Sequence, residues 1–362
     1  MGLDSLSAVE IGVELGRLLP NRKVPGEFLI QPDITLSRLF DALRPSSFSP
    51  LLTPRISDDP SASHLNYPLS VRKHASASEA ITPASSISDG ALAVLDHIGT
   101  NPELLQHKPN TLPVMLIHDG GGTALAYRLL GDLGHTVLGV HSPGLHHGKG
   151  IVSIRHAADI YAAIARQWLH KHSPHQPQLL VGGWSLGGTI AIALAAAHPD
   201  LVIGVVLLDP PPPGTAAMTL PEAEQIFSNP TARSSAGFGT LVRNQLKLNA
   251  QSLSVDADRE GGQRNLVVNL RAPVYLVSAI EPLHHQDMEA AEFTSHGSCL
   301  AWMMSRERAS MAEGAWSDIL GSLLVGTHRV PGNHFTIFTH EYAGSTTRAI
   351  RQAFDVLEAN LA

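Results

Sequence analysis

The fold is decided by residues 179–197, which read LLVGGWSLGGTIAIALAAA. The stretch begins with apolar residues typical of a buried strand, Leu179–Val181, and ends with an alanine-rich helical run, Thr189–Ala197. Between them lies a G-x-S-x-G sequence, Gly183–Gly187, with Ser185 at its centre. A strand, a sharp turn and a helix in succession expose the serine at the turn, and its neighbours must be small because the turn is tight. The stretch therefore predicts a nucleophile elbow with Ser185 as the nucleophile.

Around the elbow, from about Asp89 onward, apolar runs suited to strands alternate with helical patterns. This alternation is typical of a parallel sheet with crossover helices, and continuous apolar runs indicate strands buried on both faces. The expected strands are Val114–Ile117, Thr136–His141, Leu179–Gly183, Val202–Leu208, Val274–Ser278 and Thr327–Val330. One apolar helix face is expected from residues at spacings of three and four: Ile154, Ala158, Tyr161, Ile164 and Trp168. The sequence thus predicts an α/β architecture.

The expected nucleophile needs two partners elsewhere in the chain. A serine hydroxyl is a poor nucleophile at neutral pH, so a base must accept its proton and an acid must orient that base. In chains with a nucleophile elbow these partners follow the serine, acid first and histidine last. The chain holds 20 histidines, and His334 is the expected base because its segment, Val330–Phe335, directly follows the last expected strand. A histidine in that loop can reach across the top of the sheet.

Two carboxylates qualify as the acid, because proteins of this architecture carry it after either of two strands. Asp209 ends the apolar run Val205–Leu208, and Glu281 follows the next expected strand. An Asp that precedes prolines is also a frequent turn residue, so a purely structural role for Asp209 is the alternative. Asp209 is the preferred acid.

An oxyanion hole requires two backbone N–H groups that face the negative charge developing on the substrate. Leu186 supplies one by its position after the nucleophile. The second is expected from the glycine-rich loop His118–Gly122, because glycines let the backbone approach a substrate closely. Gly120 is preferred, with Gly121 as the alternative. The loop matches neither GxGxxG nor the P-loop pattern, so no nucleotide site is expected.

A segment of about 60 residues separates Asp209 from the strand that starts at Val274. It opens with four prolines, Pro210–Pro213, and contains helical stretches. Long insertions of this kind are usually functional. We therefore expect a lid at about residues 211–268 that shapes an acyl pocket and limits water, with an elaborated surface loop as the alternative. The fold class expected for residues 89–362 is an α/β-hydrolase fold with a helical lid insertion.

Composition excludes several classes of protein. Hydrophobic residues make up 43% of the 362 residues and charged residues 16%, which fits a globular chain. The net charge of −7 gives no general reason to bind nucleic acid or an anionic membrane, and no apolar stretch is long enough to span one. The lone cysteine, Cys299, cannot form an intramolecular disulfide, and no zinc-site spacing is present, so no metal is expected. The N-terminus lacks signal-peptide features, and a cytoplasmic location is expected.

Residues 45–88 hold twelve Ser and six Pro with no sustained period, which indicates a flexible linker. Before it, residues 1–44 contain the sequence GLDSL at Gly2–Leu6, then a helical run, then VP and PDIT. This pattern resembles the second half of an acyl or peptidyl carrier domain, in which the DSL serine carries 4′-phosphopantetheine. The resemblance implies Ser5 as the attachment residue. The first helix of the carrier bundle has no counterpart, so a partial carrier is expected, and Ser5 could instead cap a helix.

Residues from about 90 to 360 resemble the type I thioesterase domains that terminate nonribosomal peptide and polyketide synthases, particularly those of fungi. The matching elements are the HDGGGT loop, GWSLGG, the LLDPP stretch and PGNHF. That family has its acid at the position matched by Asp209. The order of carrier, linker and thioesterase is also the order found at the end of such an assembly line.

The resemblance implies an activity. A carrier domain of a parent synthase would deliver an acyl chain as a phosphopantetheine thioester, and Ser185 would take it up as an acyl-serine. Water, or a nucleophile within the chain, would then release a free acid or a ring, with hydrolysis as the default. Two alternatives stay open: a stand-alone carboxylesterase or lipase that acts on oxygen esters, and a non-catalytic module that docks on a synthase.

Overall fold

The computed structural model describes residues 101–145, 150–215, 244–249, 267–283 and 298–361. The carrier-like region 1–44 and the linker 45–88 lie outside these ranges, as does most of the expected lid. In chain order the named elements are β1 (Glu103–Gln106), β2 (Val114–Ile117), η1 (Leu125–Leu129), β3 (Val137–Val140), α5 (Ile154–His172), β4 (Leu179–Trp184), α6 (Leu186–Ala197), β5 (Val202–Leu208), β6 (Val274–Ala279), α9 (Cys299–Met304), α10 (Arg308–Leu320), η5 (Gly321–Leu323), β7 (Leu324–Val330) and α11 (Ala343–Ala359). Residues 244–249 form a further helical turn.

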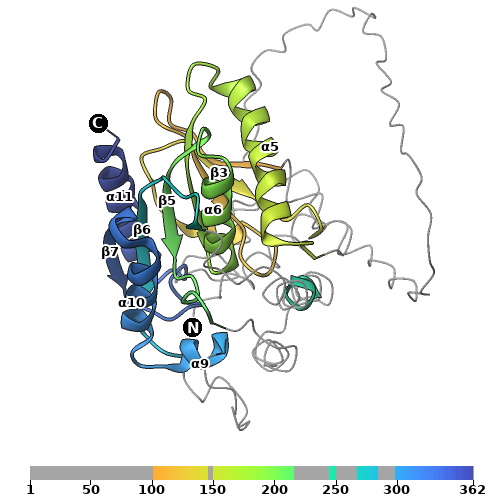
Figure 1. Ribbon diagram of the computed structural model, residues 1–362. Coiled ribbons are helices and arrows are strands. Elements are labelled where there is room, and N and C mark those ends of the chain that lie inside the picture. The colour runs from red at the N-terminus through yellow and green to blue at the C-terminus, as the bar shows by residue number, and fades with distance from the viewer. Residues whose placement is uncertain (1–100, 146–149, 216–243, 250–266, 284–297, 362) are drawn as a thin grey trace, which may run out of the picture. The chain divides into compact units, whose positions relative to one another are not determined.

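The strands form one seven-stranded sheet in the order β1-β3-β2-β4-β5-β6-β7 (Figure 1). All neighbouring pairs are parallel except β1, which runs antiparallel to β3 at one edge. The central strands β2, β4 and β5 are buried almost throughout, as continuous apolar runs require when helices cover both faces. Because the parallel strands share one direction, their carboxyl ends meet at one edge of the sheet.

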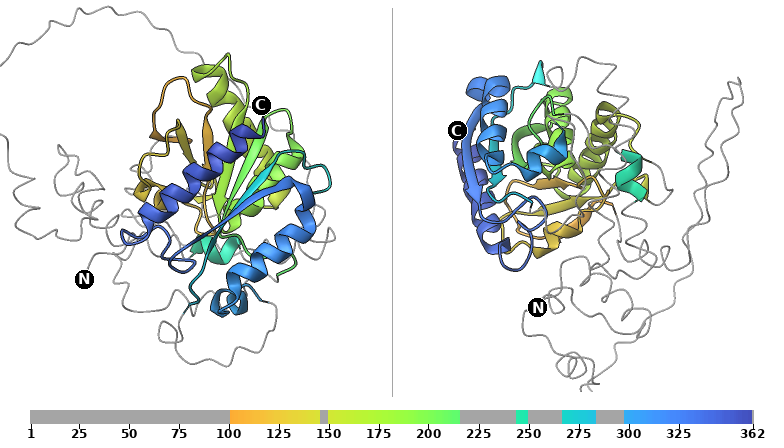
Figure 2. Two further views of the ribbon diagram at one scale, coloured as in Figure 1. Left: turned by 90° about the vertical axis from the view of Figure 1, so that its left-hand side faces the viewer. Right: turned by 90° about the horizontal axis from the view of Figure 1, so that it is seen from below.

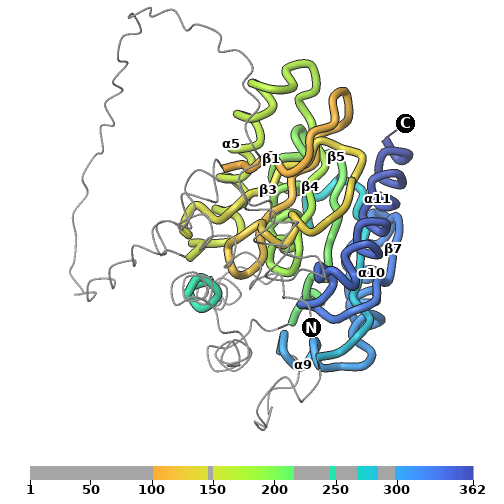
Figure 3. Tube along the Cα trace, turned by 180° about the vertical axis from the view of Figure 1, so that it is seen from behind, coloured from red at the N-terminus to blue at the C-terminus, as the bar shows by residue number. Residues whose placement is uncertain are grey.

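Two apolar clusters lie on opposite faces of this sheet. One joins α5, α6, α9 and α10 to alternate strand residues such as Val181 and Val205. The other joins α11 and the segment around η1 to the intervening residues, among them Leu180 and Val206. Figure 2 shows α11 lying across one face, and Figure 3, seen from behind, brings this helix to the front. The period of two along each strand thus divides the core between the two layers of helices.

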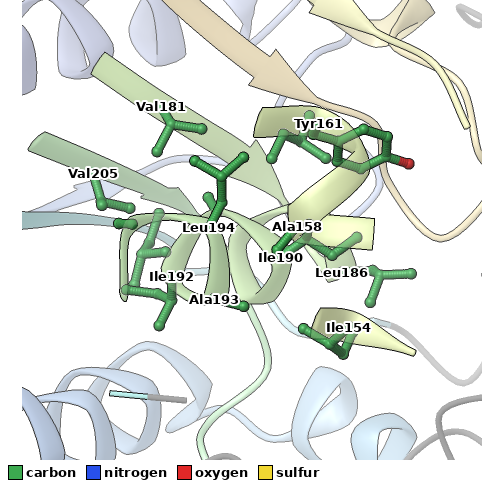
Figure 4. Packing of buried hydrophobic residues seen from close by; sticks show 14 of the residues in the cluster. Ile154, Ala158, Tyr161, Val181, Leu186, Ile190, Ile192, Ala193, Leu194 and Val205 are labelled. Atoms are coloured by element: carbon green, nitrogen blue, oxygen red, sulfur yellow. The ribbon is translucent and has the colours of Figure 1, made fainter. Parts of the chain in front are cut away.

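Helix α6 is the most deeply buried helix of the site region. Ten of its twelve residues are buried, because it is apolar on all sides and lies between the sheet and α5. Figure 4 shows Ile190 and Leu194 between Val181 of the sheet and Ala158 of α5. Full burial of an Ile or Leu side chain stabilises the fold by about 1.5–3 kcal/mol, so this contact holds the helix that starts directly after Ser185 rigidly in place.

The α/β fold predicted from the sequence is confirmed, and each of the six expected strands is present. The sequence reading missed β1, because its four residues ELLQ are only partly buried and lack both alternation and a long apolar run. The expected helix face is correct at Ile154 and Tyr161, but Ile164 and Trp168 are only partly buried. Ala165 and Leu169 take the buried positions instead, since a period of 3.6 moves the stripe toward them.

Candidate active site

Ser185 occupies a strained turn between β4 and α6. Its backbone has φ 57° and ψ −121°, a combination that costs a non-glycine residue about 1–3 kcal/mol. The glycines on either side are sterically required: a Cβ on Gly183 would lie 2.2 Å from the carbonyl carbon of Gly187, and a Cβ on Gly187 would lie 2.5 Å from the carbonyl oxygen of His118. The turn therefore has the crowding that the G-x-S-x-G sequence predicts.

The structure brings together three side chains that are far apart in the chain. Nε2 of His334 lies 3.1 Å from Oγ of Ser185, and Nδ1 of His334 lies 2.7 Å from Oδ2 of Asp209. Asp209 and His334 are 1% and 2% exposed, while Ser185 is only partly buried. With Nδ1–H donating to the carboxylate, Nε2 is left as an acceptor for the serine proton. This is the geometry that a nucleophile, a base and an orienting acid require.

Each of the three residues follows a parallel strand at its carboxyl end. Ser185 follows β4, Asp209 follows β5, and His334 lies in the loop after β7. Asp209 also has a positive φ of 45°, and its N–H donates to the carbonyl of Val277 in β6 at 2.7 Å. The sheet therefore fixes the positions of all three groups.

Glu281, the alternative acid, binds the loop that carries His334 rather than the imidazole itself. Its Oε1 accepts a hydrogen bond from Gly332 N–H at 3.0 Å, and its own N–H donates to the Gly332 carbonyl at 2.9 Å. These two bonds fasten the turn two residues before His334. The carboxylate that contacts the imidazole is that of Asp209.

Arg308, the first residue of α10, is a second partner of Asp209. Its Nη2 donates to Oδ2 of Asp209 at 2.7 Å, and its Nη1 donates to the Ala279 carbonyl at 2.6 Å. Oδ1 of Asp209 accepts from Ala279 N–H at 2.9 Å, so both carboxylate oxygens are engaged. The sequence reading missed Arg308, because it lies 99 residues from Asp209 and no local motif marks it.

Burial and neighbouring charges have opposing effects on the pKa values of Asp209 and His334. Burial by itself would raise the pKa of Asp209, but the Arg308 charge and the His334 hydrogen bond outweigh it, and the pKa is lowered. Burial lowers the pKa of His334, since the cationic ring loses solvent; Asp209 counteracts this and Arg308 adds to it. Asp209 is therefore ionised at neutral pH and His334 is a neutral base.

Aromatic side chains surround the imidazole. The ring centroids of Phe335, Trp184 and Trp302 lie 5.0, 5.4 and 5.7 Å from that of His334. Trp184 is the residue that precedes the nucleophile in the elbow motif. These rings bury the imidazole and limit the positions that it can adopt.

The glycine loop after β2 is the expected source of an oxyanion donor. The N–H groups of Gly120 and Leu186 donate to no residue within the described ranges. Gly121, the alternative, donates its N–H to Oδ1 of Asp119 at 3.0 Å. Loss of solvent raises the pKa of Asp119 to about 6. Gly121 N–H is thus engaged within the loop, and Gly120 stays the predicted donor.

Two buried contacts hold this loop from opposite sides. His118 Nε2 lies 2.5 Å from the hydroxyl of Tyr161 in α5, and burial lowers the pKa of this histidine to about 4. From the other side, Nδ2 of Asn249 donates to the Gly120 carbonyl at 2.8 Å, and Oδ1 of Asn249 accepts from Ile151 N–H at 3.0 Å. The sequence reading did not single out Asn249, which lies within the expected lid.

Several predicted features lie outside the described residues. Ser5 and the rest of the carrier-like region lie outside the described residues, as do residues 216–243 and 250–266 of the expected lid. In the described part of the chain, no cluster of three or more His, Cys, Asp and Glu residues could hold a metal ion. No helix of that part is long and apolar enough to cross a membrane.

Comparison with known proteins gives matches to one fold family and to several fungal proteins. Residues 103–247 match the family model of the alpha/beta hydrolase fold. The chain is 36% identical along its whole length to an atrochrysone carboxylic acid synthase of Calonarius odorifer, of which it spans 24%. It is 28% identical to a probable thioesterase of Botryotinia fuckeliana (strain B05.10), over 72% of this chain and 92% of that protein.

Among solved structures, the thioesterase domain of NocB in covalent complex with a fluorophosphonate nocardicin G analog matches 67% of this chain and 94% of that one. The TM-score is 0.49 and the sequence identity 23%. The fold itself rests on the sheet topology, the elbow and the family model described above. Residues 103–247 therefore have the alpha/beta hydrolase fold, and the chain is similar in sequence to fungal thioesterases.

Proposed function

We propose that the chain is a thioesterase domain that releases an acyl or peptidyl chain from the phosphopantetheine thioester of a carrier protein. The observation that carries this proposal is the relay from Ser185 through His334 to Asp209 at the carboxyl edge of the sheet. Such a relay transfers acyl groups, and the relatives supply the class of substrate. They include thioesterases as well as a synthase that this chain matches along its whole length.

In the first half of the reaction, Ser185 Oγ attacks the thioester carbonyl while His334 Nε2 accepts the hydroxyl proton. The N–H groups of Gly120 and Leu186 stabilise the oxyanion that forms; loss of one such donor typically costs about 2.7–4 kcal/mol. The carbon–sulfur bond then breaks, and His334 returns its proton to the pantetheine sulfur. The products of this half are an acyl-serine and a free thiol.

In the second half, water or a nucleophile within the acyl chain attacks the acyl-serine. His334 again accepts the proton and passes it to Ser185 Oγ as the carbon–oxygen bond breaks. Hydrolysis gives a free acid, and attack from within the chain gives a ring by lactone, lactam or Claisen-type closure. Hydrolysis is the default outcome. Secondary-metabolite biosynthesis is the setting that fits the relatives, and a parent synthase with its carrier is the proposed partner.

The acyl chain is proposed to arrive on 4′-phosphopantetheine, either at Ser5 of this chain or on a separate carrier. The arm enters the site as part of the substrate, and no group of the triad needs a further cofactor. The chain spans about a quarter of the synthase that it matches. The reactions that build the acyl chain before its release are therefore assigned to a parent synthase, not to these residues.

The proposal is tested by comparing acyl-pantetheine thioesters with the matching oxygen esters as substrates. We expect a higher kcat/KM for the thioesters and covalent labelling of the wild type, but not of Ser185→Ala, by a fluorophosphonate probe. A strong preference for oxygen esters would instead identify a carboxylesterase. Absence of labelling in the folded wild type would favour a non-catalytic docking module.

A further inference from the structure

The buried side chain of Arg308 is the feature that the proposed mechanism leaves unexplained. In the described part of the chain it is the only lysine or arginine that is buried, with 0% of its surface exposed. Beyond its bonds to Asp209 and Ala279, its guanidinium lies 4.4 Å from the centroid of the Trp302 ring. Its Nε is buried and lacks a hydrogen-bond partner. Arg308 is therefore a buried cation whose Nε–H donor has no acceptor.

A purely structural role explains this arrangement poorly. Removing a guanidinium from water carries a large desolvation penalty, and an apolar side chain of similar volume often packs as well or better. Asp209 already has hydrogen-bond donors in Ala279 N–H and His334 Nδ1–H. Oδ2 of Asp209 accepts hydrogen bonds from both His334 and Arg308. The cation therefore contacts the same carboxylate oxygen that orients the base.

We infer that Arg308 is a positioning residue of the triad: it keeps Asp209 ionised and its Oδ2 fixed toward His334, and it opposes protonation of the resting imidazole. The inference rests on the proposed function. Two contacts hold Arg308 for this role. Trp302 Nε1 donates to its backbone carbonyl at 3.0 Å, and the same indole ring lies edge-on to His334.

The charges around the base account for the effect. The groups that face the His334 ring are Ser185 after β4, Asp209 after β5 and the aromatic rings described above, while Arg308 approaches from α10 behind the carboxylate. Glu281, after β6, is bonded to Gly332 instead. With His334 neutral, Asp209 and Arg308 form a balanced ion pair. Protonation of His334 adds an unbalanced charge, so Arg308 extends the neutral, reactive form of the base to lower pH.

The test uses Arg308→Met, which removes the charge at similar volume, Arg308→Gln, which keeps a donor, and Arg308→Lys, which keeps the charge. The matched control is Arg329→Met. Arg329 also binds α10, through Glu313 at 2.6 Å, but it is exposed and lies outside the site. The readouts are thermal unfolding, the rate of fluorophosphonate labelling, and the pH profile of kcat/KM for an acyl-pantetheine thioester.

We expect Arg308→Met and Arg308→Gln to lower kcat/KM at pH 7 by about 10²-fold, as misplacement of a catalytic group typically does. The acid limb of the profile should move up by about one pH unit, the effect expected when a neighbouring cation is lost. The acid limb of Arg308→Lys should stay near that of the wild type, because the positive charge is kept. Its kcat/KM should still fall, because the two donors of the guanidinium, Nη1 and Nη2, are lost. Arg329→Met should leave both limb and rate unchanged.

An unchanged acid limb in a folded Arg308→Met or Arg308→Gln protein would overturn the inference, whatever the loss in rate. If neither variant folds, Arg308→Lys decides through its rate: the inference requires kcat/KM to fall because the paired donors to Asp209 and Ala279 are lost, and an unchanged rate would overturn it. A different result would exclude the proposed function, namely a Ser185→Ala variant that keeps its turnover of the thioester. If Ser185→Ala is inactive but the acid limb of the Arg308 variants is unchanged, the proposed function stands and only the role of Arg308 is excluded.

Discussion

In the proposed mechanism Ser185 gives its proton to His334, so acyl transfer requires both residues. We expect Ser185→Ala and His334→Ala each to reduce turnover of an acyl thioester by about four to six orders of magnitude, and the double variant to be little worse than either. Steady-state kinetics with thiol detection measures this. If the loss of turnover in the double variant equalled the product of the two single losses, the residues would act independently.

The acid can be identified by exchanging a carboxylate for its amide. Asp209→Asn should lower kcat by about 10³–10⁴-fold, because an amide beside Nδ1 favours the wrong tautomer of His334. Glu281→Gln should stay within about threefold, since its side-chain oxygen still accepts from Gly332 N–H. The reverse result would transfer the role of the acid to Glu281.

The pH dependence follows from the burial of His334. Only the neutral ring accepts the serine proton, so activity is lost as the pH falls through the pKa of His334 in the folded enzyme. Burial and Arg308 lower this pKa, so the acid limb of kcat/KM should lie below pH 6.5. A limb at or above 6.5 would show that the charge of Asp209 outweighs both effects.

Sequence patterns singled out the three side chains that the structure brings together, but not the residues that hold them in place. Ser185 is marked by its motif, and Asp209 and His334 by the strands they follow and by their order in the chain. Arg308 and Asn249 act through contacts to residues 99 and 129 positions away. Pairings of that kind depend on the finished fold, and neither residue lies in a local pattern.

Among the elements, the helical turn 244–249 has the contacts to influence the oxyanion loop. Asn249 is 1% exposed and joins Gly120, Ile151 and Gln245 by hydrogen bonds of 2.8, 3.0 and 3.1 Å. A Cβ on Gly120 would lie 2.9 Å from Leu246 Cδ2, so the turn packs directly on the loop. The segment in which the sequence predicts a lid thus includes one residue, Asn249, that holds the loop in place.

Asn249→Ala should therefore weaken catalysis without removing a catalytic group. We expect kcat to fall about tenfold, less than the 10²–10³-fold loss typical of deleting an oxyanion donor. The protein should also lose about 1–3 kcal/mol in its free energy of unfolding, because buried polar groups lose partners. Asn244→Ala changes an exposed residue of the same turn and is the control. Equal effects of the two variants on kcat would exclude a role for the Gly120 contact.

Strands and helices were predictable to the extent that burial leaves a pattern in the sequence. Central strands such as Val202–Leu208 were found because they are buried on both faces. The edge strand Glu103–Gln106 was not, because it pairs with β3 in the opposite direction and is only partly buried. Its presence is determined by long-range pairing rather than by local preference.

For the whole molecule, one sheet explains why residues 118–334 form a single site. The parallel strands bring their carboxyl ends together, so the loops after β2, β4, β5 and β7 meet there. The sequence could predict this convergence, because the order of nucleophile, acid and base is tied to the order of the strands. The acyl substrate could not be predicted in the same way, since most of the expected lid lies outside the described residues.

The proposed function requires an acyl chain to pass from a pantetheine thiol to Ser185. The most direct measurement is intact-protein and peptide mass spectrometry after brief incubation of the full chain with an acyl-pantetheine thioester. We expect one added acyl group on the peptide that contains Ser185, an equal amount of free thiol, and neither in Ser185→Ala. Thiol release that persists in Ser185→Ala, or an acyl group on a different residue, would contradict it.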